Sequence, residues 1–228
     1  MKLAIMQPYL FPYIGYWQLI QAVDTFVVFD DVNYINRGWI NRNNILIGGK
    51  SRLFTIALGG ASQNRLINDI AILDTFSDFV KTLRQNYSKA PFFGDVMGLV
   101  ERAIAFDKAN LAAFIANSIS IICDYIGIGT RLLMSSDIEK DNSLKGQAKV
   151  IEICRLLGAT EYINSIGGTE LYDASVFAEN GIELKFLKTE FATYRQFKNE
   201  FVPGLSIIDV MMFNAKEEVK EMLDDYEY

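Results

Sequence analysis

The chain has 228 residues, of which 50% are hydrophobic and 22% are charged, and this is the size and composition of one globular domain. Its 28 acidic and 22 basic residues give a formal charge of −6, so it lacks the basic surface of a general nucleic-acid or anionic-membrane binder. It has no histidine, which excludes a Ser-His-Asp triad, a Cys-His dyad and imidazole metal ligands.

The N-terminal part is predicted to form a β-α-β unit. Residues 3–7 are a short apolar run, residues 13–23 place apolar side chains at helical spacing, and residues 25–32 contain a continuous apolar run typical of a strand buried on both faces. A β-hairpin is then expected, because residues 44–47 and 52–58 flank Gly48 and Gly49, which supply the positive φ angles of a tight turn.

The rest of the chain is predicted to be a helical block followed by renewed strand-helix alternation. We expect helices at 76–87, 92–106, 111–126, 144–157, 171–180, 206–214 and 217–223, and strands at 132–135, 161–166 and 183–187. Ser206 is predicted as an N-cap with Asp209 as its capping-box partner. The expected fold is a single α/β domain over 1–228, with a Rossmann-like parallel-sheet core at about 1–70 and 128–190, a β-hairpin, a helical insertion at about 75–127 and C-terminal helices at about 205–224.

The termini and cysteines favour a cytoplasmic protein without membrane insertion. The first residues lack the apolar run of a signal peptide, and no segment approaches the roughly 18 apolar residues of a membrane span. Cys123 and Cys154 lie in apolar, helix-like runs, so we expect buried, reduced thiols. The oligomeric state is not predicted.

The densest candidate binding motif is the loop at residues 7–16, between the first strand and the first helix. Ligands of parallel α/β sheets bind at this edge, and a helix N-terminus there suits a phosphate. We therefore expect Gln7, Phe11 and Gly15 to contact a ligand, with Gly15 allowing a nucleotide close to the helix. The alternative is that the prolines and aromatic residues only pack a turn.

Asp30 and Asp31 follow the second strand and are predicted to lie at the same edge as candidate catalytic carboxylates. They are suited to Mg²⁺, a ribose hydroxyl or a substrate amine, although aspartates are also ordinary at strand ends. Asn164, Gly167 and Gly168 end a late strand, where backbone amides would hold an anion. The loop at 7–16, the two aspartates and the turn at 164–168 are expected to converge on one face.

The segment at 33–44 combines amides, arginines and aromatic rings, which suit a sugar or a nucleotide. Tyr34, Trp39 and Asn41 are candidate ligand residues. Arg42 is expected to bind a phosphate or carboxylate, with an internal salt bridge to Asp30 or Asp31 as the alternative. Lys50, at the hairpin turn, is a further phosphate candidate or a solvated lysine. Single-stranded nucleic acid would use similar residues, but the net negative charge argues against it.

Four of these motifs, in order along the chain, resemble the WbqC-like family of bacterial proteins. They are Gln7-Pro8 to Tyr16, Asp30-Asp31 to Arg42, Tyr162-Ile163-Asn164 to Tyr172, and Leu205-Ser206-Ile207-Ile208-Asp209. The resemblance implies a role in surface-polysaccharide synthesis, O-antigen among them, and a transfer of an amino-acid or acyl group to an amino sugar.

A more distant resemblance links Tyr13-Ile14-Gly15-Tyr16 to the HxGH motif of nucleotidylyltransferases and pantothenate synthetase. It implies catalytic positions for Tyr13 and Tyr16, with ATP and Mg²⁺ as possible cofactors. A phenol donates a hydrogen bond but carries no positive charge, so each replacement would cost on the order of 10²-fold in rate unless Arg42, Lys50 or Mg²⁺ compensates.

Three functions follow from the sequence. The first is a transferase or amide-forming ligase that binds a nucleotide or nucleotide-sugar and acylates an amino sugar. The second is a non-catalytic protein that binds a nucleotide-sugar or a glycan-assembly partner. The third is a degenerate nucleotidylyltransferase.

Overall fold

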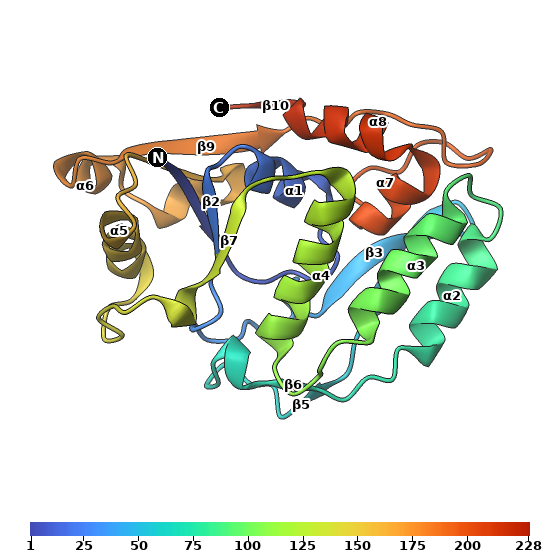
Figure 1. Cartoon of the computed structure of the whole chain (residues 1–228), viewed down its shortest axis with the longest axis horizontal. Coiled ribbons are helices and arrows are strands. Elements are labelled where there is room, and N and C mark those ends of the chain that lie inside the picture. The colour runs from blue at the N-terminus through green and yellow to red at the C-terminus, as the bar shows by residue number, and fades with distance from the viewer.

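The computed structural model describes all residues 1–228 and contains one central sheet with helices on both faces (Figure 1). The sheet order is β10-β9-β8-β1-β2-β7, and every strand except β10 is parallel to its neighbours. The predicted Rossmann-like α/β fold is confirmed. The sheet strands are β1 (Lys2–Met6), β2 (Thr25–Val28), β7 (Arg131–Met134), β8 (Glu161–Ser165), β9 (Glu183–Thr189) and β10 (Tyr226–Glu227).

The strand order places a topological switch point between β1 and β8. Along the chain the parallel strands come in the order β1, β2, β7, β8, β9, but across the sheet the first strand lies between the second and the fourth. This is the order of doubly wound dinucleotide-binding folds, in which connections leave β1 and β8 in opposite directions and open a crevice at their carboxyl ends. The fold itself thus supplies a hollow beside the loop at 7–16.

The two faces of the sheet bury alternate side chains of the same strands, as the continuous apolar runs predicted. Ala4, Phe26 and Val28 join a core of 49 buried residues, which includes residues of α1 (Ile14–Gln21) and α4 (Leu111–Ile126). Leu3, Ile5 and Val27 join a smaller core of 11 buried residues with α5 (Gly146–Leu156) and α6 (Ala174–Glu179) on the opposite face (Figure 1). Burial on both faces fixes the register of these strands.

The helical block between β6 and β7 consists of α2 (Ser77–Tyr87), α3 (Phe93–Ile104) and α4, which lie side by side in Figure 1. The predicted bounds of α4 are confirmed. Asn110 caps its first turn by accepting a hydrogen bond from the Ala113 amide at 3.0 Å, and Gly127 ends it with a φ of 81°. The apolar faces of all three helices bury into the larger core of the sheet.

The predicted hairpin is β3 (Arg42–Ile47) and β4 (Lys50–Thr55), which stand apart from the central sheet. Gly48 and Gly49 have φ angles of 59° and 74°, as the turn requires. A second two-stranded sheet, β5 (Leu58–Gly59) with β6 (Ala71–Ile72), was not predicted, because two-residue strands leave no apolar period in the sequence.

The C-terminal part contains α7 (Ile207–Phe213), α8 (Lys216–Glu221) and the edge strand β10. Ser206 is the N-cap of α7, as predicted, since its Oγ accepts from the Ile208 amide at 3.3 Å. The capping-box role of Asp209 was wrong, because its carboxylate instead accepts hydrogen bonds from Tyr87, Tyr194 and Gln196.

The two cysteines are buried and unpaired, as predicted. Burial raises the pKa of each thiol to about 12, so both Cys123 and Cys154 remain protonated. None of the helices combines the length and the apolar character that a membrane crossing requires.

Candidate functional site

A cavity of about 820 Å³ lies at the switch point, against the carboxyl ends of β1 and β8. Its walls come from the loop after β1, the first turn of α1, the loop after β2 and the turn after β8. The sequence-predicted residues that line it are Gln7, Tyr13, Gly15, Tyr16, Trp39, Asn164, Gly167 and Gly168. The loop at 7–16 and the turn at 164–168 therefore converge on one face, as predicted from the topology. Their roles in binding stay predictions.

The lining of the cavity carries no charged side chain. Its polar groups are phenols, amides and a hydroxyl. Burial raises the pKa of Tyr16, whose hydroxyl donates to the Gln7 carbonyl oxygen at 2.9 Å. Burial also raises the pKa of Tyr9, against the smaller opposing effect of Arg42, and the Tyr9 hydroxyl donates to Asn43 Oδ1 at 3.0 Å. Both phenols thus stay neutral, so the cavity offers hydrogen bonds and ring faces in place of charge.

Tyr9, which we did not single out from the sequence, is the centre of an aromatic cluster. Its ring centroid lies 6.0 Å from Trp39, 6.0 Å from Tyr16 and 6.4 Å from Tyr13. The other lining residues that sequence reasoning missed include Asn44, Ser165 and Tyr172. Ser165 lies inside the predicted turn at 164–168 and Tyr172 follows it, so the same strand-end rule applied to every residue of this segment would have included them.

The hairpin strand β3 holds the loop after β1 through hydrogen bonds to its backbone. Asn43, fully buried on β3, donates through Nδ2 to the carbonyl oxygens of Leu10 and Phe11, at 3.3 Å and 2.5 Å. Phe11 itself was expected to contact a ligand, and the structure places it elsewhere. Its ring is buried in the core and stacked on that of Phe79, with the two ring centroids 6.1 Å apart, and its backbone has a positive φ of 43°.

Gly15 has a packing reason that the sequence did not reveal. A Cβ atom at this position would lie 2.1 Å from Oγ1 of Thr189, at the end of β9, and 2.6 Å from Cε2 of Tyr13. The glycine thus lets α1 approach the sheet edge closely, in addition to lining the cavity.

We expect Gly15→Ala to lower the free energy of unfolding by about 1–3 kcal/mol, the usual cost of overpacking. Chemical denaturation measures it, and Gly98→Ala is the matched control. Gly98 lies inside α3 with no atom within 4 Å of an added Cβ, so its substitution should stabilise the protein by about 0.5–1 kcal/mol. Adding Thr189→Ala to Gly15→Ala should restore part of the loss. Equal, small effects of the two glycine variants would contradict this account.

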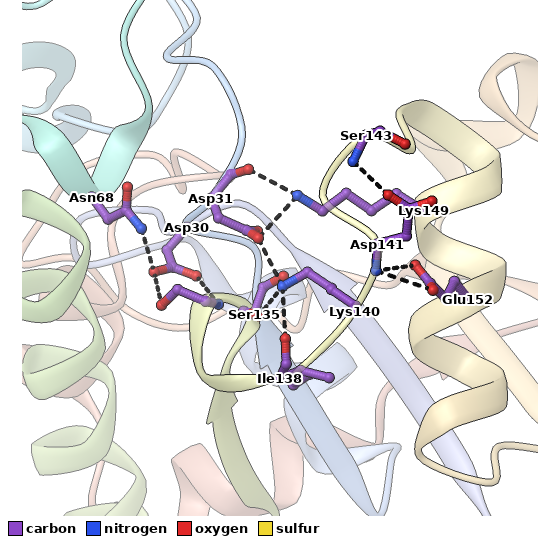
Figure 2. A network of polar contacts seen from close by, with 11 residues as sticks. Asp30, Asp31, Asn68, Ser135, Ile138, Lys140, Asp141, Ser143, Lys149 and Glu152 are labelled. Atoms are coloured by element: carbon purple, nitrogen blue, oxygen red, sulfur yellow. Dashed lines mark hydrogen bonds and ion pairs between the residues drawn. The ribbon is translucent and has the colours of Figure 1, made fainter.

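Asp30 and Asp31 do not line the cavity, which corrects their predicted place in the site. Figure 2 shows the polar contacts that engage them instead. Asp30 is buried and accepts hydrogen bonds from the Ser136 amide at 2.9 Å, Ser136 Oγ at 2.6 Å and Asn68 Nδ2 at 3.1 Å. Its oxygens are thereby committed to a structural link between the carboxyl ends of β2 and β7.

Asp31 is engaged by two lysines. Its Oδ2 lies 2.8 Å from Lys140 Nζ and 2.9 Å from Lys149 Nζ (Figure 2). Burial raises the pKa of this carboxyl, but the two ammonium groups outweigh that effect and hold the pKa below its ordinary value. Two ammonium groups occupy the position that a cation would need, so this carboxylate pair does not fit the predicted Mg²⁺ site.

The polar side chains of the segment at 33–44 that were predicted to bind a ligand mostly form hydrogen bonds within the protein. Tyr34 donates to Asn41 Oδ1 at 2.8 Å, and Asn41 donates to the Ile56 carbonyl oxygen at 2.9 Å, so neither reaches the cavity. Arg42 donates to backbone carbonyl oxygens, and its alternative salt bridge with Asp30 or Asp31 was wrong. Lys50 is exposed at the hairpin tip and does not line the cavity.

Comparison with known proteins identifies the family. The model of the WbqC-like protein family matches residues 7–221. The chain belongs to the WbqC-like protein family. The curated "Uncharacterized protein Rv1507c" of Mycobacterium tuberculosis (strain ATCC 25618 / H37Rv) is 30% identical over 229 residues, covering 97% of each chain. No solved structure matches the chain. The loops that form the cavity, from Gln7 to Gly204, all lie inside the WbqC-like region.

Proposed function

We propose that the protein binds the sugar part of a nucleotide-sugar in the switch-point cavity, as a step in surface-polysaccharide biosynthesis of the O-antigen type. The observation that carries this proposal is a roomy cavity lined by aromatic rings and amides, with no charged side chain. A sugar presents hydroxyl groups to amides and apolar C–H faces to aromatic rings, which is the match such a lining offers.

The phosphates of the ligand have partners in the backbone. The Gly15 amide, in the first turn of α1 beside the cavity, has no acceptor within that helix, whereas the Tyr16 amide donates to the Tyr13 carbonyl oxygen at 3.1 Å. Gly167 and Gly168 add backbone at the opposite wall, in the turn after β8. These groups supply partial positive charge where the lining has no lysine or arginine.

Catalysis is the part of the proposal that the lining supports least. Acyl transfer to a sugar amine needs a base, and the lining contains no Asp, Glu, Lys, Cys or His to provide one. Tyr16 is buried and donates to Gln7, which leaves Tyr13 as the phenol of the HxGH-like motif to contact a phosphate. This favours the second candidate, a non-catalytic nucleotide-sugar or glycan-assembly protein. A ligase would have to receive its donor already activated, or take ATP and Mg²⁺ through groups outside the cavity lining.

A thermal-shift screen against nucleotides and nucleotide-activated amino sugars tests the proposal. At a ligand concentration 100 times Kd the expected stabilisation is about 2.7 kcal/mol, or a rise in Tm of about 5–10 °C. Trp39→Ala should weaken binding about tenfold, because it removes a ring face of about 1.4 kcal/mol.

Phe106→Ala is the control, since Phe106 is a 39% exposed aromatic residue outside the cavity and its loss should leave affinity unchanged. Binding together with release of AMP or pyrophosphate would identify an enzyme, and binding without turnover the second candidate. A screen in which no nucleotide-sugar binds would overturn the proposal.

A further inference from the structure

Arg42 is enclosed by the loop that precedes it. Its Nε donates to the Gly38 carbonyl oxygen at 2.7 Å, and a terminal nitrogen donates to the carbonyl oxygen of Arg37. The guanidinium also lies over the ring of Trp39, 5.4 Å from its centroid. One side chain of β3 thus holds both the backbone and the ring of the loop after β2.

The backbone of that loop is strained and requires stabilising contacts. Arg37 has a φ of 60°, in the left-handed region that costs a non-glycine residue about 1 kcal/mol. The Gly38 amide donates to the Ile35 carbonyl oxygen at 3.1 Å, which closes a tight turn. Strained turns of this kind persist where surrounding contacts hold them, and the two bonds from Arg42 are such contacts.

Trp39, the residue that Arg42 contacts, is part of the cavity lining. It faces Tyr9 at 6.0 Å and is 47% exposed. A half-exposed ring on an irregular loop has few contacts of its own to fix it, so the guanidinium on one side and Tyr9 on the other set its orientation.

We propose that Arg42 is a positioning residue that holds Trp39 as a wall of the cavity. The expected effect of Arg42 on the affinity for a nucleotide-sugar rests on the proposed function. The assignment replaces the expected direct contact between Arg42 and a ligand anion, since the guanidinium donates to two carbonyl oxygens of its own chain and does not line the cavity.

Acrylamide quenching of tryptophan fluorescence tests the positioning without any ligand. The chain has two tryptophans, and Trp17 is fully buried, so Trp39 dominates the quenching. Arg42→Ala should raise the quenching constant of Trp39 about twofold, because release exposes the covered half of the ring. Subtracting the signal of the Trp39→Phe variant in each background isolates Trp39.

Arg52→Ala is the matched control. Arg52 is exposed on β4, and its side chain makes no hydrogen bond or ion pair in the structure. Its substitution removes the same charge, so quenching should not change. A loss of stability alone would lower Tm without altering quenching well below it. Unchanged quenching in folded Arg42→Ala would overturn the proposal.

A double-mutant cycle with the nucleotide-sugar found in the screen tests the link to binding. Arg42→Ala should weaken binding about tenfold in the wild-type background and have no effect in the Trp39→Ala background. Additive losses would show that Arg42 contacts the ligand itself and would overturn the assignment. If no nucleotide-sugar binds, the proposed function fails while quenching still decides the role of Arg42.

Discussion

Asp31→Asn is expected to lower the free energy of unfolding by about 3–5 kcal/mol at pH 7, the cost of removing one partner from a buried ion pair. The side chains of Lys140 and Lys149 are 1% and 6% exposed, and both ammonium groups share Oδ2 of Asp31. An asparagine leaves two buried positive charges without a counter-ion. Urea denaturation of the two proteins measures the difference.

The pH dependence of this loss has a defined sign. The folded pKa of Asp31 lies below its unfolded value of about 3.9, so its contribution is fully present above that value and disappears as pH falls through the folded pKa. The gap between wild type and Asp31→Asn should therefore be constant from neutral pH to about pH 5 and shrink below it.

Glu101→Gln is the control for this experiment. Glu101 pairs with Arg84 at 2.6 Å, but both side chains are about half exposed, so its loss should change stability by no more than about 1 kcal/mol. Adding Lys140→Met to Asp31→Asn should recover part of the lost free energy of unfolding, because it removes one of the two buried ammonium groups left without a counter-ion. A gap between Asp31→Asn and wild type as small as that of the control would contradict a structural role for the carboxylate.

The aspartates show where sequence reasoning about the site ends. The strand-end rule placed Asp30 and Asp31 at the correct edge of the sheet, because that position follows from β2 alone. Their chemistry depends on Ser136, Lys140 and Lys149, which are more than 100 residues away along the chain and arrive with β7 and α5. No local sequence pattern predicts partners so far away along the chain. The two loops that form the cavity were predictable because each follows its own strand.

Elements were predictable where a local signal fixed them. Asn110, a helical apolar period and Gly127 delimit α4, and the diglycine turn delimits the hairpin. The strand β10 has no such signal. It is a two-residue acidic-tail segment that pairs with β9 through backbone atoms, while buried Gln18 donates to the carbonyl oxygens of Met222 and Asp225 at 3.0 Å and 2.9 Å. The alternative salt bridge of Arg42 with Asp30 or Asp31 was wrong for the same reason, since its acceptors are backbone carbonyls that any residue type provides.

Asp209→Ala is expected to cost about 4 kcal/mol or more, because each buried donor left without an acceptor costs about 1–3 kcal/mol. The carboxylate is fully buried in the first turn of α7 and accepts three hydrogen bonds of 2.7 Å, from Tyr87, Tyr194 and Gln196. The Tyr87 hydroxyl in turn accepts from the Leu46 amide at 2.7 Å. One carboxylate therefore ties α2, β3, α7 and the segment at 194–196 together.

The burial of the Asp209 carboxylate opposes the stability gained from its three hydrogen bonds. Burial raises the pKa of Asp209, and the three hydrogen bonds counteract that rise only in part. A raised folded pKa means that the protonated carboxyl group contributes most stability, which is fully present below the unfolded value of about 3.9 and is lost as pH rises to the folded pKa. Stability of the wild type relative to Asp209→Ala should therefore fall, not rise, between pH 4 and the folded pKa, opposite in sign to the Asp31 comparison.

A double-mutant cycle between Asp209 and Tyr87 separates the hydrogen bonds from the loss of the side chain itself. Tyr87→Phe alone removes one donor to the carboxylate and the acceptor of the Leu46 amide. In the Asp209→Ala background the same substitution removes a donor that is already unsatisfied, so it should cost less by about 1 kcal/mol or more. Strictly additive costs in urea denaturation would show that the two groups are not coupled, and that packing alone accounts for the effect of Asp209.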